Sequence, residues 1–257
     1  MAGALAKREI IVPSIPAVAM LGKGFKGYKS MKEEPVRKVK VVEDETLKQL
    51  KKAFGSLVYD LRYVNHDKLY KSACQHVKRL KYRAADVAKF SLVLVSLQED
   101  EATFGTRAGI FLSALINSGT DTDYIIHTNQ LTMTLQHLGH GNTKNIIVEG
   151  YAGRFVGWNM KGGSITVNGD AGMGAGFVMK GGFLTVNGNT GSWAGRGMQG
   201  GVITVKGDAT GNDRLTIIGN AGDEMQGGVI RVEGEIGTVG KVEHGKIFHK
   251  GVKIIDK

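Results

Sequence analysis

Cysteine and proline are both scarce in this chain of 257 residues. Cys74 is the only cysteine, which excludes an intramolecular disulfide and a metal site built from several thiolates. A chain without disulfides suits a reducing compartment, so we expect a cytoplasmic protein. Pro13, Pro16 and Pro35 are the only prolines, and all three lie within residues 1–42, which we expect to form an extended arm.

Long hydrophobic runs are lacking as well. No segment approaches the roughly 18 consecutive apolar residues of a membrane-spanning helix. The apolar start of the chain is broken by Lys7, Arg8 and Glu9, which is a poor pattern for a signal peptide. The sequence therefore predicts no insertion into a membrane.

Positive charge is concentrated at one end of the chain. Residues 1–100 contain 20 Lys and Arg against 11 Asp and Glu, whereas residues 101–257 contain 14 against 13. The net charge of +10 therefore belongs almost entirely to the N-terminal part. Such a segment favours an acidic partner, which would be another subunit, a nucleic acid or an anionic membrane surface. A solvated basic face explains the charge equally well.

The candidate partner-binding site lies inside this basic segment. Four lysines recur at every third residue, with two aromatic residues between them and glycines that loosen the backbone. These residues, which we call the basic arm, are Lys23, Phe25, Lys26, Tyr28, Lys29 and Lys32. Flexible basic segments with aromatic side chains suit phosphate backbones and exposed bases. They also suit an acidic groove on a protein, and an arm without a target is the remaining alternative.

Glycine, in contrast, is abundant, and 26 of the 38 glycines fall between Gly150 and Gly240. In this region a short run repeats at steps of 19, 19, 19 and 27 residues, so the last step carries an eight-residue insertion. The runs are NIIVEG from Asn145, SITVNG from Ser164, FLTVNG from Phe183, VITVKG from Val202 and VIRVEG from Val229. No segment within a unit is long enough for a helix, and the Gly-Gly corner of each unit would break one. We therefore expect a β-solenoid whose coils bury their apolar faces against one another.

The alternation within each run predicts which side chains face the core. The second and fourth positions are apolar, and the third is mostly polar or β-branched, so two columns should point inward and one outward. The inward columns comprise Ile146, Val148, Ile165, Val167, Leu184, Val186, Ile203, Val205, Ile230 and Val232. A further column of Met160, Met179, Met198 and Met225 is explained better by core packing than by a soft-metal site.

Helical periodicity dominates the region between the basic arm and the coils. Apolar spacing predicts helices over residues 44–57, 67–82 and 106–117, with Asp44 and Thr106 as caps. Residues 90–97 fit a strand or a buried helix, and their helix-forming neighbours favour the helix. A short strand is expected over residues 124–127. The expected organisation is an arm over 1–42, a helical region over 43–104, and a β-helix domain with a cap helix over 105–257.

Two motifs raise the question of chemistry. Residues 172–176 read GMGAG, a fragment of a dinucleotide-binding fingerprint, but a strand follows where that motif needs a helix, so these glycines belong to a turn. His127, His137 and His140 lie close together, and imidazoles can bind metals. Their spacing matches no metal motif. We therefore expect no catalytic residue, cofactor or metal in this chain.

The repeated coil with its Met-Lys/Gln-Gly-Gly corner resembles the GXGXG family. That family includes the C-terminal domain of the glutamate synthase large subunit and one of the subunits of formylmethanofuran dehydrogenase. The resemblance is strongest over residues 145–234, and FGTRAGIFLSALIN (104–117) is similar to the helix that precedes the family's coils. It implies a right-handed parallel β-helix, a mainly β fold with an α-rich, basic N-terminal region. It also implies a module that scaffolds catalytic subunits and has no catalytic residues of its own.

Three functions follow from these features. The leading hypothesis is a non-catalytic scaffold subunit of an intracellular multi-subunit enzyme, an oxidoreductase by resemblance, whose partners are the other subunits. The second is an RNA- or ribosome-associated protein that binds nucleic acid through the basic arm. The third is a stand-alone enzyme such as a small hydrolase.

Overall fold

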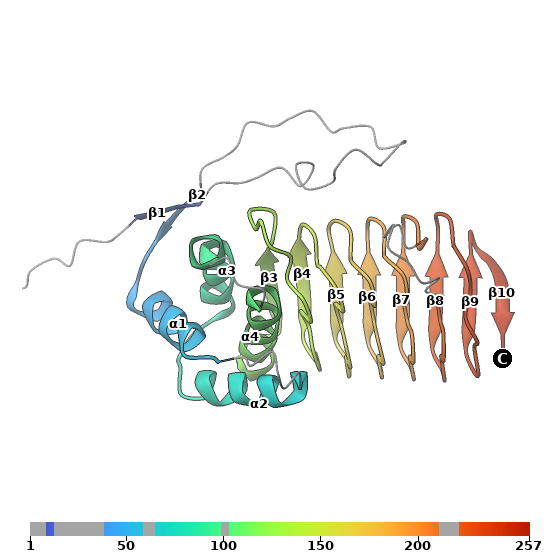
Figure 1. Cartoon of the computed structure of the whole chain (residues 1–257), viewed down its shortest axis with the longest axis horizontal. Helices are drawn as coiled ribbons and strands as arrows, with labels where there is room; N and C mark the ends of the chain where they lie inside the picture. Colours follow the sequence, from blue (N-terminus) through green and yellow to red (C-terminus); the bar gives the residue numbers. More distant parts are fainter. Residues whose placement is uncertain (1–8, 13–38, 59–64, 99–102, 211–220) are drawn as a thin grey trace, which may run out of the picture.

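The computed structural model describes residues 9–12, 39–58, 65–98, 103–210 and 221–257. A group of helices lies at one end of the molecule, and a single row of strands extends away from it (Figure 1). The row is a parallel β-solenoid of about six turns, as the repeat predicts. One continuous hydrophobic cluster runs from the helices through all the coils.

The solenoid sheet has eight strands in the order β10-β9-β8-β7-β6-β5-β4-β3. From β3 to β9 every neighbouring pair is parallel, so each coil contributes one strand to the same side of the stack. The strands are β3 (Asp123–His127), β4 (Asn145–Glu149), β5 (Ser164–Val167), β6 (Phe183–Val186), β7 (Val202–Val205), β8 (Val229–Val232), β9 (Lys246–His249) and β10 (Val252–Asp256).

The predicted inward columns are confirmed. Ile165, Leu184, Ile203 and Ile230 pair in register on successive strands, and each is at most 1% exposed. The third positions between the two inward columns are half-buried or exposed, as an outward column should be. The four methionines of the corner column are completely buried, which confirms their role in core packing.

The stack is longer than the repeat indicates, because one strand is added at each end. β3 pairs with β4, placing Tyr124 beside Ile146, and β9 pairs with β8, placing Ile247 beside Ile230. The segment 237–257 therefore contains another coil strand before it covers the end of the stack. β10 then turns back antiparallel to β9, with an irregular register between Lys253 and Ile255. A bulge and lysines are common at protected sheet edges.

The polar residues at the coil turns form hydrogen-bond ladders along the stack. Asp170 accepts a bond of 2.7 Å from the backbone N–H of Asn189, whose side chain accepts one of 2.7 Å from Asp208 N–H. Asp208 in turn accepts a bond of 2.8 Å from Glu235 N–H. Each side chain thus satisfies a backbone donor that the tight turn leaves without a strand partner. These carboxylates are structural elements of the coil.

The GMGAG segment forms part of a coil corner, as the turn interpretation predicts. Gly176 has a φ of +69°, and a Cβ atom there would lie 2.4 Å from Cδ1 of Ile203. Any side chain would both strain the backbone and collide with the inward column. The next regular element is β6, so the segment opens no helix.

Four α-helices and one 3-10 helix form the other end of the molecule within the described residues. They are α1 (Glu45–Gly55), α2 (His66–Val77), α3 (Ala84–Val93), η2 (Leu94–Leu97) and α4 (Phe104–Ser118). Asp44 caps α1 as predicted, accepting a bond of 2.8 Å from Leu47 N–H. The helical interpretation of residues 90–97 is confirmed by α3 and η2. β1 (Glu9–Val12) and β2 (Val39–Val42) pair as a separate two-stranded antiparallel sheet.

Two predicted helix boundaries were wrong. Thr106 is not a cap, because α4 begins at Phe104, whose ring is buried 5.9 Å from that of Phe54. α2 ends at Val77 instead of continuing to residue 82. The chain leaves the helix there so that Tyr82 Oη can donate a bond of 2.8 Å to the carbonyl of Leu115. Tertiary packing sets both boundaries.

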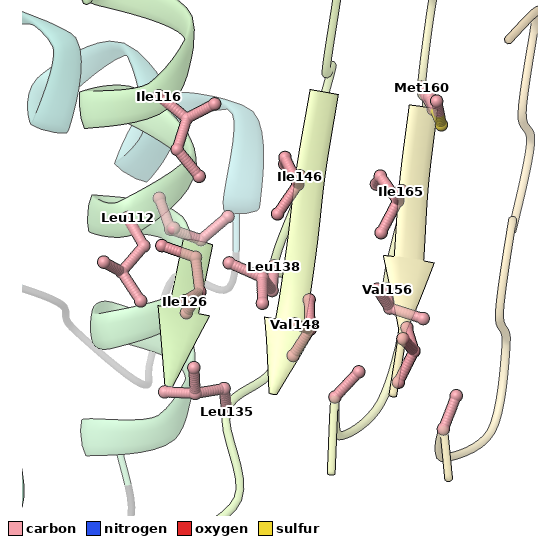
Figure 2. Close-up of a cluster of buried hydrophobic side chains, with 14 of the residues drawn as sticks. Leu112, Ile116, Ile126, Leu135, Leu138, Ile146, Val148, Val156, Met160 and Ile165 are labelled. Carbon is pink, nitrogen blue, oxygen red and sulfur yellow. The ribbon is translucent and has the colours of Figure 1, made fainter. Parts of the chain in front are cut away.

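Helix α4 lies against the first coils (Figure 2). Leu112 and Ile116 of this helix face the inward side chains of the first coil, including Leu138 and Ile146. The approach is close because Gly109 has no side chain: a Cβ atom there would lie 1.9 Å from the carbonyl oxygen of Gln136. The helix therefore covers the open end of the stack, where the columns would otherwise meet water.

Candidate functional site

The site predicted from the sequence lies outside the described residues. Lys23, Phe25, Lys26, Tyr28, Lys29 and Lys32 all fall within residues 13–38. The basic arm therefore stays a prediction.

The described part of the chain contains a cluster of imidazole and aromatic rings where α2 meets the first coils. We call it the joint cluster, and it consists of His66, Tyr70, His137, His140 and Trp158. The first two residues come from α2 and the other three from coil corners. The ring centroids of His66 and His137 lie 4.1 Å apart, and those of Tyr70 and His140 lie 4.8 Å apart. Trp158 packs against His137 at 4.6 Å.

The coil backbone presents these rings to the helix. His137 has a φ of +62°, a left-handed conformation that is uncommon for residues other than glycine. Phe155, one coil further, has a φ of +58°, and its ring stacks on His137 at 5.1 Å with an interplanar angle of 6°. Ser113 of α4 holds the corner, since its Oγ donates to the carbonyl of His137 at 3.1 Å and accepts from His140 N–H at 3.2 Å.

Burial keeps the imidazoles of the joint cluster neutral. Loss of hydration lowers the pKa of His137 to about 2, and the neighbouring His66 and His140 contribute to the same shift. Burial also lowers the pKa of His66, although Asp67 opposes this effect. The pKa of His140 is lowered by burial, again against the opposing charge of Asp67. All three rings are therefore uncharged at neutral pH.

Two buried nitrogens of the cluster have no hydrogen-bond partner among the residues that the structure describes. They are Nδ1 of His137 and Nδ1 of His140. Nε2 of His140 lies 3.2 Å from a carboxylate oxygen of Asp67, whose side chain is 74% exposed. A second proton on either imidazole would thus add a buried donor without an acceptor, which is costly. The arrangement can hold neutral imidazoles firmly, and it disfavours a proton shuttle at neutral pH.

The three histidines that are close in sequence do not form one site. His127 lies at the end of β3 and is half-buried beside Glu149, whereas His137 and His140 belong to the joint cluster. No group of three or more His, Cys, Asp or Glu residues suited to a metal ion occurs among the described residues. Sequence analysis missed His66 and Trp158 as members of the cluster, because α2 and the coil corner approach only through the tertiary fold.

The wall of a shallow hollow at the start of α3 contains a structural ion pair between Arg83 and Asp121. The hollow is lined by Arg83, Ala84 and Asp121 among others. Asp121 accepts a bond of 2.6 Å from Ala84 N–H and lies 2.8 Å from the guanidinium of Arg83. Arg83 and this backbone bond lower the pKa of Asp121. The Asp121 carboxylate caps the N-terminus of α3, where its negative charge interacts favourably with the helix dipole.

The outward side of the sheet is a second candidate surface. Between β4 and β7 its first and third positions carry no charged residue, and Phe183 is 62% exposed there. The role of this surface and the role of the joint cluster do not follow from the fold alone.

Comparisons with family models, with curated proteins and with solved structures found no match for this chain. Within the part of the chain that the structure describes, none of the helices has the length and apolar character needed to cross a membrane.

Proposed function

We propose that this protein is a non-catalytic β-helical scaffold subunit of an intracellular multi-subunit enzyme. By resemblance to the GXGXG family, that enzyme is an oxidoreductase, and the coils wind in the right-handed sense. The partners are the other protein subunits, which hold the cofactors and perform the chemistry.

The observation that carries this proposal is how the polar side chains of the coils are used. Asp170, Asn189 and Asp208 stand at the coil turns, and each accepts a hydrogen bond from a backbone N–H of the next coil. The inward columns of the strands are aliphatic side chains, and the corner column consists of methionines, all in register. Such a body is rigid along its length and repeats the same backbone spacing, which suits a platform for other subunits.

RNA binding through the basic arm is the second candidate function. It is supported by the +9 net charge of residues 1–100 and by the lysine–aromatic alternation of the arm. On the scaffold proposal the same residues dock into an acidic groove of a partner subunit. The two functions differ in the partner and in how strongly salt weakens its binding.

Native purification through a tag on the full chain distinguishes these functions. The scaffold proposal expects co-purifying subunits in fixed stoichiometry, with the absorbance of a flavin, an iron–sulfur cluster or a molybdopterin in the complex. Ribosomal RNA and ribosomal proteins in the eluate would instead support RNA binding. If the chain elutes alone at physiological salt and turns over a substrate, both proposals are wrong.

A further inference from the structure

The outer side of helix α2 and the turn that follows it carry positive charge that no carboxylate neutralises. Five exposed cations lie between residues 65 and 81, and we call them the basic side of α2: Lys68, Lys71, Lys78, Arg79 and Lys81. Asp67 is the only carboxylate in the same stretch. Within the part of the chain that the structure describes, none of the five side chains forms an ion pair or a hydrogen bond.

The helix holds these cations in a row. Leu69, Ala73 and Val77 are buried where α2 packs against α4, so the opposite positions turn outward. Lys68 and Lys78 stand near the two ends of this outward side, about 15 Å apart along the helix axis. α2 runs along the edge of the helical end of the molecule, and its outer side faces away from the other helices (Figure 1).

The stability of the helix does not account for all of this charge. A cation at the C-terminal end, such as Lys78, interacts favourably with the helix dipole. Lys68 lies in the first turn, where a positive charge is unfavourable, and Lys71 adds a like charge on the same side. The carboxylate of Asp67 lies 3.2 Å from Nε2 of His140. The basic side therefore repels itself, and an anionic partner would relieve this repulsion.

The composition of the basic side favours a phosphate backbone over a protein or a lipid surface. All eight exposed residues from 65 to 81 are polar. Protein interfaces are enriched in aromatic residues and depleted of lysine. Helices that lie on membranes insert an apolar side, which in α2 is buried inside the protein. Lysines along one side of a helix, in a chain whose pI is about 9.6, are typical of nucleic-acid binding.

We propose that the basic side of α2 binds the phosphate backbone of double-stranded RNA. The proposal rests on RNA binding, the second candidate function, and assigns it to a surface other than the basic arm. The exposed residues from 65 to 81 include no aromatic ring on which an unpaired base could stack. The basic side therefore contacts phosphates along a duplex and does not distinguish base sequences.

Fluorescence anisotropy of the full chain with a labelled RNA duplex of about 20 base pairs, at about 50 to 200 mM salt, tests the proposal. The test variant replaces Lys71, Lys78 and Lys81 by Gln. It should weaken binding by about tenfold or more at the lowest salt. The slope of log affinity against log salt should become shallower by about one for each lysine removed. Two duplexes of unrelated sequence should respond alike, because phosphate contacts carry no sequence information.

A matched control variant removes the same charge elsewhere. Lys180, Lys206 and Lys241 are exposed on separate coils and form no ion pair with the described residues. Their replacement by Gln should change the affinity less than about threefold, because salt screens charges that lie away from the contact. Both triple variants should melt at the temperature of the wild type, since all six side chains are exposed.

A variant of the basic arm, with its four lysines replaced by Ser, separates this proposal from the function on which it rests. If that variant loses all binding while the test variant binds normally, RNA binding is retained and the basic side of α2 has no part in it. Equal losses in the test and control variants also overturn the proposal, because net charge alone would then explain binding. If the wild type binds neither the duplex nor a single strand of equal length, RNA binding itself is wrong. Binding to polyglutamate or to phosphatidylserine vesicles, with the duplex left unbound, assigns the basic side to an acidic protein or a lipid surface and overturns the proposal.

Discussion

The imidazole rings of His66 and His137 lie 4.1 Å apart and join helix α2 to the first coil of the solenoid. Neither ring is charged at neutral pH, because burial lowers the pKa of both. The contact between helices and coils therefore depends on neutral histidine. This dependence makes the stability of the helical end sensitive to mild acid.

Acidification from pH 6.5 to pH 5 should destabilise the protein. The pKa of His137 is about 2 in the folded state and near 6.5 in the unfolded chain, so the unfolded state binds more protons in this window. His66 and His140 shift in the same direction. Each histidine contributes a loss of at most about 1.4 kcal/mol per pH unit. Urea unfolding at half-unit pH steps measures this slope.

The variant His137→Phe is the control for this dependence. Phe155 occupies the same corner position one coil further with a φ of +58°, so phenylalanine fits the left-handed backbone there. The variant should fold and show a shallower loss of stability between pH 6.5 and pH 5. An unchanged slope would mean that His137 does not determine the acid response.

The substitution Leu184→Asp should unfold the coils. Leu184 is completely buried between Ile165 and Ile203, and a carboxylate there would have no partner. The cost should exceed about 4 kcal/mol. Its neighbour Thr185 points outward, so Thr185→Asp in dilute protein should cost less than about 1 kcal/mol. Circular dichroism and urea unfolding compare the two, and equal stability would contradict the assigned faces of β6.

Helix α4 should tolerate no side chain at Gly109. A Cβ atom at this position would lie 1.9 Å from the carbonyl oxygen of Gln136, so Gly109→Ala must push the helix away from the coil. A loss of about 1–3 kcal/mol is expected from the thermal midpoint. A Cβ atom at Gly55 of α1 would have no atom of the described residues within 4 Å, so Gly55→Ala should be neutral or slightly stabilising. If both substitutions behave alike, α4 does not pack closely on the end of the stack.

The basic arm should contribute to partner binding without contributing to stability. Replacing Lys23, Lys26, Lys29 and Lys32 by Ser should weaken partner binding and flatten its salt dependence, with the melting temperature unchanged. An RNA partner should show a steep loss of affinity with salt, whereas a protein groove should show a milder loss that also depends on Phe25 and Tyr28. Normal binding by this variant, or a clear drop in its melting temperature, would refute a docking role.

The coils could be predicted from the repeat because each coil buries its apolar side chains against the coils next to it in sequence. Ile165, Leu184 and Ile203 occupy the same inward position at a fixed step of 19 residues. The pattern of one coil therefore predicts which residues its neighbours bury. β3 and β9 were harder to recognise as coil strands. The step from β3 to β4 is 22 residues and the step from β8 to β9 is 17, and His249 stands where β4 to β8 have valine. A strand whose spacing departs from the 19-residue period is not recognised as part of the repeat, even when its backbone continues the parallel sheet.

The joint cluster could not be predicted from sequence, because its parts come from separate elements. His66 and His137 are 71 positions apart, and no periodicity connects a helix start with a coil corner. Helix ends were missed for a related reason. α2 ends at Val77, and Tyr82 beyond it bonds to the carbonyl of Leu115, a tertiary contact that local helix propensity does not include. Local patterns predict elements, and packing decides where those elements end and meet.

The most direct test of the scaffold proposal is to purify the complex through a tag on this chain and to measure its mass before and after dissociation. Native mass spectrometry should find one assembly containing this chain and at least one cofactor-bearing subunit. After dissociation the chain should carry polypeptide mass alone, with flavin, nicotinamide or metal retained by its partners. A chain that carries stoichiometric cofactor or metal, or that turns over a substrate when isolated, would contradict the account.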